Sequence, residues 1–266
     1  MASSSRQTDL ALIDHGQGLP FLLVHGFPLN GAMWNAQIEP LAKYCRVLVP
    51  DLRGFGHNDP TPPDQITTME QMADDLAALL DRLNVDQPIV LAGLSMGGYI
   101  ALAFHKKYPQ RLRALVLTDT RAAADTPTAV QSRQAVAQKI LEEGPSVLID
   151  MLPKLFAPGT LNEKPQIVEA AREMILQANP HTTRAALLGM AQRDDSTGHL
   201  PEIACPTLLV VGAEDRLTPP AEMRTMAQAI PDARLVEIPD AGHMSPMEQP
   251  TAFNTALIDL LTELRG

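Results

Sequence analysis

The stretch GLSMGG, residues 93–98, directly follows the apolar run PIVLA at residues 88–92. It has the form G-x-S-x-G, which is typical of a sharp strand-to-helix turn that exposes a serine nucleophile. The residues two before and two after that serine crowd the turn, so they need to lack a Cβ atom. Gly93 and Gly97 meet this requirement, whereas a serine that only caps a helix would not need them. The stretch therefore predicts a strand, a strained turn at Ser95 and a helix.

Short apolar runs alternate with helical patterns on both sides of this turn. Strands are expected at 21–24, 46–49, 89–91, 115–117, 208–211 and 235–238, with an edge hairpin opening at 10–13. Helices are expected at 67–83, 96–108, 221–229 and 252–264, the first with a capping box of Thr67 and Glu70. Continuous apolar strands separated by helices predict a parallel sheet covered on both faces.

The alternation stops between residues 121 and 197, where the patterns are mostly helical. Helices are expected at 130–143, 147–155, 166–178 and 182–193. We interpret 121–197 as a helical cap, or lid, inserted above one edge of the sheet. The core is then formed by residues 1–120 together with 198–266.

Composition limits the classes of partner. The chain has 266 residues and a formal net charge of -10, which argues against nucleic acid and anionic membranes. No apolar run is long enough for a membrane span, and residues 1–6 lack the apolar stretch of a leader, so a cytoplasmic location is expected. The sequence leaves the oligomeric state open.

Five motifs in order resemble those of the α/β-hydrolase superfamily over nearly the whole chain. They are HGFP at 25–28, DLRGFG at 51–56, the turn at 93–98, GAED at 212–215 and AGH at 241–243. The resemblance is to small cap-bearing serine esterases, enol-lactonases and cofactor-free haloperoxidase-like enzymes. It implies an α/β-hydrolase fold, with a mostly parallel eight-stranded sheet, helices on both faces and an inserted helical cap.

The motifs place three catalytic candidates in the order that this fold uses, Ser, Asp, His. Ser95 is the expected nucleophile and needs an adjacent base, for which His243 is the candidate. Asp215 would hold the tautomer of His243 and stabilise its charged form. Asp119 follows another strand end and is the alternative acid.

The oxyanion of a tetrahedral intermediate needs hydrogen-bond donors. The backbone N–H groups of Met96 and Phe27 are the candidates, and His25 is expected to shape the second loop through hydrogen bonds. No close Cys/His grouping is present in the sequence, so neither a metal nor a cofactor is expected.

Candidate substrate contacts are Trp34, Arg121 and Met244. Methionine suits an adaptable apolar wall, and Met244 adjoins His243. Arg121 could bind a substrate carboxylate or form a salt bridge with Asp119 or Asp125. Glu248 is expected to support the start of the last helix through the helix dipole.

Three functions are the main candidates at this point. The first is a serine hydrolase that cleaves small to medium apolar carboxylic esters or lactones through an acyl-enzyme. The second uses the same residues for perhydrolase or haloperoxidase chemistry by way of a peracid. The third is a non-catalytic ligand receptor on a hydrolase fold, which would not need all three catalytic side chains.

Overall fold

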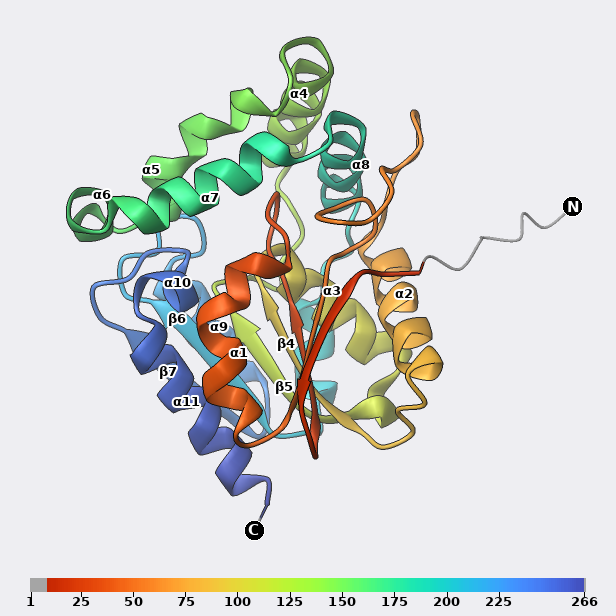
Figure 1. Cartoon of the computed structure of the whole chain (residues 1–266), viewed down its shortest axis with the longest axis vertical. Helices are drawn as coiled ribbons and strands as arrows, with labels where there is room; N and C mark the ends of the chain where they lie inside the picture. Colours follow the sequence, from red (N-terminus) through yellow and green to blue (C-terminus); the bar gives the residue numbers. More distant parts are fainter. Residues whose placement is uncertain (1–8, 266) are drawn as a thin grey trace, which may run out of the picture.

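One sheet of seven strands organises the computed structural model, which describes residues 9–265 (Figure 1). Its order is β1-β3-β2-β4-β5-β6-β7. The strands are β1 (Leu12–Gly16), β2 (Pro20–Val24), β3 (Arg46–Pro50), β4 (Ile89–Leu94), β5 (Leu112–Thr118), β6 (Thr207–Gly212) and β7 (Ala233–Ile238). Residues 1–6, which entered the expectation about a leader, lie outside the described part.

The edge at β1 differs from the expectation in two ways. β1 pairs antiparallel with β3 rather than with β2, so β1 and β2 do not form a hairpin. All other neighbours run parallel. Within residues 9–265 the sheet has seven strands and not eight, because β1 packs directly on β3 and ends the sheet there.

Helices cover both faces of the sheet. Figure 1 shows α1 (Asn35–Ala42) in front of the strands, where it packs against α11 (Pro250–Glu263). α2 (Met69–Arg82) packs against α3 (Met96–Lys107) on the opposite face, and α9 (Pro220–Ala229) packs on β6 and β7. The strands between these layers are apolar and buried, and every residue of β2 and of β4 is buried.

The capping box of α2 is shifted by one residue from the predicted pair. Gln71 N donates to Thr68 Oγ1 at 3.2 Å, and Thr68 N donates to Gln71 Oε1 at 3.0 Å. Thr67 is buried, and its N–H donates instead to Ala185 O in the helical segment above. The sequence therefore located this helix start correctly but assigned the wrong threonine.

The α-helices of residues 121–197 lie above the carboxyl ends of the strands (Figure 1). They are α4 (Pro127–Glu143), α5 (Leu152–Leu155), α6 (Pro158–Glu163), α7 (Pro165–Gln177) and α8 (Pro180–Ala191). Proline occupies the first position of α4, α6, α7 and α8, where its missing N–H costs nothing. We keep the name cap for residues 121–197.

The chain enters and leaves the cap at one place. Ser196 N donates to Ala122 O at 2.9 Å, and Arg193 Nη1 lies 2.8 Å from Asp125 Oδ1. The guanidinium of Arg193 also stacks over the ring of Tyr99 in α3, 4.1 Å from its centroid. The base of the cap is therefore anchored to the core. Among the described residues, no helix has the length and apolarity needed to cross a membrane.

Candidate active site

Ser95 occupies the strained turn that the sequence predicted between β4 and α3. Its φ is 54° and its ψ is -111°, a backbone conformation with positive φ that residues other than glycine seldom adopt. A Cβ on Gly93 would lie 2.1 Å from Gly97 O, and a Cβ on Gly97 would lie 2.4 Å from Val24 O. Both glycines are therefore required by close backbone contacts, as predicted.

The hydroxyl of Ser95 does not cap the helix that follows it. Among the described contacts its side chain makes no capping hydrogen bond to α3, and the residue is partly exposed. The backbone is fixed instead, because Ser95 N donates to Thr118 O at 2.9 Å and Thr120 Oγ1 donates to Ser95 O at 2.8 Å. The turn presents Oγ while its own backbone is held at both ends.

His243 and Asp215 form a buried pair at the ends of β7 and β6. His243 Nδ1 lies 2.8 Å from Asp215 Oδ2. Asp215 Oδ1 accepts the N–H of Leu217 at 2.8 Å and that of Thr218 at 3.0 Å. Burial opposes ionisation of Asp215, but the charge of His243 and these hydrogen bonds outweigh it, so the pKa of Asp215 lies below its usual value.

Thr218 is a member of this site that the sequence analysis missed. Its hydroxyl donates to Asp215 Oδ2 and lies 3.2 Å from His243 Nδ1. The side chain therefore contacts both partners of the pair and restricts how the carboxylate can turn. No local sequence signal marked it, because its contact with His243 depends on how the loops after β6 and β7 meet.

Asp119, the alternative acid, lies beside the pair and binds other groups. Its Oδ1 accepts Gly212 N at 2.8 Å, and its Oδ2 accepts the hydroxyl of Ser245. Complete burial and the nearby charge of Asp215 raise the pKa of Asp119 well above its usual range. Within the described residues no hydrogen bond joins Asp119 to His243. Asp119, which follows β5, therefore connects the end of β6 to the segment after His243. Its neighbour Thr120 connects the end of β5 to Ser95.

The loop after β2 lies against Ser95. A Cβ on Gly26 would stand 3.6 Å from Ser95 Cβ. His25 Nδ1 donates to Gly26 O at 3.0 Å, because its Nε2 accepts the N–H of Leu52 at 2.9 Å. Burial lowers the pKa of His25 to about 4. The ring is therefore neutral near pH 7 and shapes this loop through hydrogen bonds, as expected.

Two backbone N–H groups, one in the loop after β2 and one directly after Ser95, have no acceptor in the described part of the chain. Met96 is the first residue of α3, so its N–H has no partner within that helix. Phe27 N donates to no backbone or side-chain acceptor in residues 9–265. These are the two amides that the sequence analysis selected as oxyanion donors.

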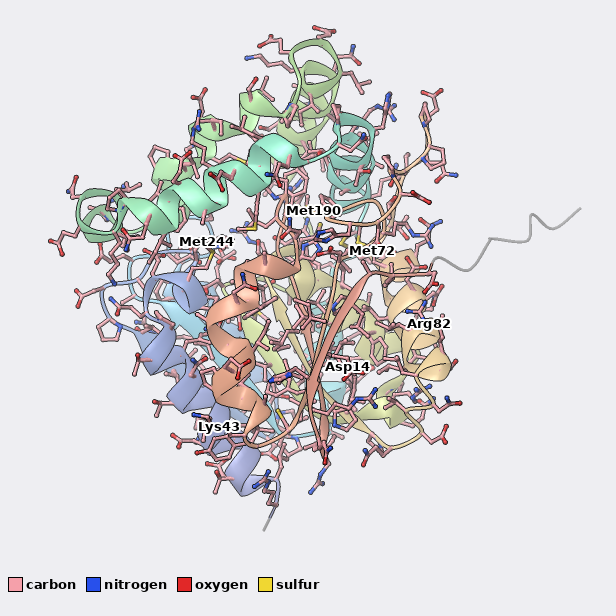
Figure 2. The ribbon with its side chains drawn as sticks, in the orientation of Figure 1. Asp14, Lys43, Met72, Arg82, Met190 and Met244 are labelled. Atoms are coloured by element: carbon pink, nitrogen blue, oxygen red, sulfur yellow. The ribbon has the colours of Figure 1, made fainter. Side chains whose placement is uncertain are left out.

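The three predicted substrate contacts have different environments. Trp34 and Met244 are buried, and the ring of Trp34 packs on Phe253 with 5.9 Å between centroids. Figure 2 shows Met244 and Met190, the latter in α8 of the cap, at the level where the cap meets the core. Arg121 donates to Leu217 O and lies 3.2 Å from the carboxylate of Glu222.

The salt bridge expected between Arg121 and Asp119 or Asp125 was assigned to the wrong partners. Asp125 forms ion pairs with Arg133 and Arg193. Asp119 accepts hydrogen bonds from Gly212 N and from the hydroxyl of Ser245. α9 brings Glu222 to Arg121 across a gap of about a hundred residues in sequence, which periodicity cannot reveal.

Two cavities separate α7 of the cap from the core. Their volumes are about 600 and 210 Å³. Both are lined by Asn30, His57, Met174 and Gln177, and the smaller one also by Pro28 and Leu29, which follow Phe27. Ser95 and His243 do not line either cavity. The lining residues Asn30 and, in the smaller cavity, Pro28 and Leu29 place both cavities against the loop after β2.

Glu248 has a different role from the predicted one. It lies in α10 (Ser245–Glu248) and is completely buried. Its carboxylate accepts the N–H groups of Gly242, Met244 and Ala157 rather than those at the start of the last helix. Glu248 therefore contacts both the segment that carries His243 and the cap.

The chain is similar to known proteins over most of its length. Residues 20–250 match a family model described as the alpha/beta hydrolase fold. The chain is 31% identical to 3-oxoadipate enol-lactonase 2 of Acinetobacter baylyi over 232 residues, covering 86% of this chain and 83% of that protein.

Solved structures match over almost the full length. A malate-bound thermophilic esterase from Thermogutta terrifontis has a TM-score of 0.97 and 48% identity, covering 99% of this chain and 97% of that one. The enol-lactonase of Burkholderia xenovorans LB400 has a TM-score of 0.89 and 29% identity, covering 97% and 98%. The match extends across the cap as well as the sheet.

Proposed function

The chain belongs to the α/β-hydrolase family, and from that premise we propose that it is a serine hydrolase of small to medium apolar carboxylic esters or lactones. Hydrolysis of carboxylic esters is the activity that the family and its relatives support. The finer proposal is carried by the buried His243–Asp215 pair together with the strained turn at Ser95. The consecutive residues Asp119 and Thr120 contact both regions, because Asp119 accepts the hydroxyl of Ser245 and Thr120 donates to Ser95 O.

In the proposed reaction Ser95 Oγ attacks the carbonyl carbon of the ester. His243 holds its Nδ1 proton toward Asp215, which leaves Nε2 free to accept the proton of Ser95. The imidazolium then gives that proton to the leaving alkoxide as the C–O bond breaks. A water molecule, deprotonated by the same nitrogen, attacks the acyl-enzyme and releases the acid and Ser95.

The tetrahedral intermediates carry a negative oxygen between the Phe27 and Met96 N–H groups. Both amides are free of protein acceptors in the described chain, so no existing hydrogen bond has to be broken when the oxyanion forms. Met96 also lies at the N-terminus of α3, where the helix dipole favours negative charge. Loss of one such donor typically lowers the rate about 10²–10³-fold.

The proposed substrate class rests on the similar proteins rather than on a cavity volume. The cavities beside the loop after β2 measure about 600 and 210 Å³, and neither is lined by Ser95 or His243. The similar proteins include an esterase and two enol-lactonases, which act on esters and cyclic esters by their names. We therefore place esters and lactones first among the substrates.

Hydrolysis of p-nitrophenyl acetate, butyrate and octanoate by the wild type and by Ser95→Ala tests the proposal. We expect turnover of the short esters and loss of activity in Ser95→Ala. Turnover that is unchanged in Ser95→Ala would contradict it. Halogenation or peracid formation faster than hydrolysis would favour the perhydrolase alternative, and ligand binding without turnover would favour a receptor.

A further inference from the structure

A completely buried carboxylate joins the cap to the segment that carries His243. Glu248 Oε1 accepts the N–H of Gly242 at 2.8 Å and that of Met244 at 3.2 Å, the two neighbours of His243. Glu248 Oε2 accepts the N–H of Ala157 in the cap at 2.8 Å. The two oxygens of one side chain therefore serve two segments that are about ninety residues apart.

Other hydrogen bonds and one close backbone approach also join the same two segments. Met244 N also points to Leu155 O of the cap, at 3.2 Å, and Lys164 Nζ donates to Glu248 O at 2.7 Å. A Cβ on Gly242 would lie 2.6 Å from Ala157 N, so only glycine permits this approach. The cap segment 155–164 and the segment 241–248 thus form one interlocked contact.

Because Glu248 is a buried carboxylate, a change in its contact with the cap is expected to change its contact with the segment that carries His243. An ionised group without water needs all of its acceptors filled, and hydrogen bonds from N–H groups to a carboxylate are stronger than neutral ones. If the cap segment moves away, Oε2 loses the Ala157 N–H. The carboxylate then turns, takes up water or binds a proton, and each change disturbs Oε1 and the N–H groups on either side of His243.

We propose that Glu248 is a positioning residue that aligns His243 only while the cap segment 155–164 is seated on the core. This inference rests on the proposed function, in which His243 is the catalytic base. It assigns the cap a role in setting the base, in addition to covering the substrate. Arg193, whose guanidinium stacks on Tyr99 of α3, anchors the other end of the cap to the core, so displacement of 155–164 is a local change rather than loss of the whole cap.

The substitution Glu248→Gln tests the coupling with little change in size. An amide supplies an acceptor for only one of the two segments and turns an N–H₂ group toward the N–H of the other. We expect kcat for p-nitrophenyl butyrate to fall at least about tenfold with a much smaller change in KM, because the base is misaligned while the pocket is retained. Glu202→Gln is the matched control, since Glu202 is exposed and pairs only with His199 in the described structure.

Hydrogen exchange supplies a readout that does not depend on activity. In Glu248→Gln we expect faster amide exchange in peptides covering 155–164 and 240–248 together, with no change in α3. Lys164→Met leaves the Glu248 carboxylate unchanged and removes the cap side chain that donates to Glu248 O. We expect it to accelerate exchange in 240–248 as well. This second variant keeps the test decisive if Glu248→Gln does not fold.

Two results would overturn the inference. One is a Glu248→Gln enzyme that is less stable but has wild-type kcat per folded molecule, which is a structural role alone. The other is exchange that accelerates in 155–164 without any change in 240–248. An inactive wild type would refute the proposed function instead, and the exchange experiment would still report whether the two segments are coupled.

Discussion

Asp215 and His243 contact each other through one oxygen and one nitrogen, 2.8 Å apart, with the second oxygen of Asp215 held by the backbone of 217–218. Asp119 lies at the end of the neighbouring strand β5 and faces Ser245 and Gly212 instead. The two carboxylates thus differ in their hydrogen-bond partners. Asp215 is bonded to His243, whereas Asp119 is bonded to the loops around it.

The substitution Asp215→Asn is expected to reduce kcat by about 10⁴-fold, because an amide no longer fixes the tautomer of His243. Asp119→Asn is the matched control, since asparagine retains an acceptor for Gly212 N and a donor toward Ser245. We expect its kcat to stay within about tenfold of the wild type. Steady-state rates with p-nitrophenyl butyrate measure both, and the reverse ranking would identify Asp119 as the acid.

Asp119 also predicts a pH dependence of stability. Its pKa in the folded protein is raised by burial and by Asp215, so the folded state binds a proton that the unfolded state has released. The contribution to stability is complete below the unfolded pKa and is lost as the pH rises toward the folded one. Denaturant unfolding of the wild type and Asp119→Asn should therefore diverge in favour of the variant with rising pH; parallel curves would refute this.

His25 predicts the opposite dependence at acid pH. Its pKa is about 4 when folded, against 6.5 when unfolded, so the unfolded state gains the proton first and stability falls between these values. The expected loss from pH 7 to pH 5 is about 2 kcal/mol. Chemical unfolding at both values should show a smaller loss for His25→Gln than for the wild type. Equal losses would mean that His25 is not held neutral.

The glycines of the Ser95 turn predict a steric effect on folding. In Gly93→Ala the new Cβ would lie 2.1 Å from Gly97 O, and we expect a loss of about 3 kcal/mol because backbone has to move. Gly198→Ala is the control, because its Cβ would meet nothing within 4 Å, and it should change stability by less than about 1 kcal/mol. Similar unfolding midpoints for the two variants would contradict this interpretation of the turn.

Local rules explain which parts of this molecule were predictable from sequence. The turn at Ser95 follows from the steric needs of Gly93 and Gly97, and the buried strands follow from continuous apolar runs. The contacts of Glu248 and Arg121 were not predictable in this way. Their partners, Ala157 and Glu222, are about 90 and 100 residues away, and they meet only when the cap and α9 are in place.

The order of the edge strands was also beyond local rules. The pattern of β1 identifies a strand but not the neighbour with which it pairs, so a hairpin with β2 was expected. Its hydrogen bonds go to β3 because β2 is already bonded on both sides, by β3 and β4. Thr218 illustrates the same limit within the site, since its contact with His243 depends on how the loops after β6 and β7 meet.

The intact mass of the protein after reaction with a p-nitrophenyl alkylphosphonate tests the central claim most directly. This reagent phosphonylates a serine that is activated by a neighbouring base and releases p-nitrophenol. We predict one adduct per chain, located by peptide mapping on Ser95 and absent from Ser95→Ala. An adduct on another residue, or none in a preparation that hydrolyses esters, would contradict the assignment of Ser95 as the nucleophile.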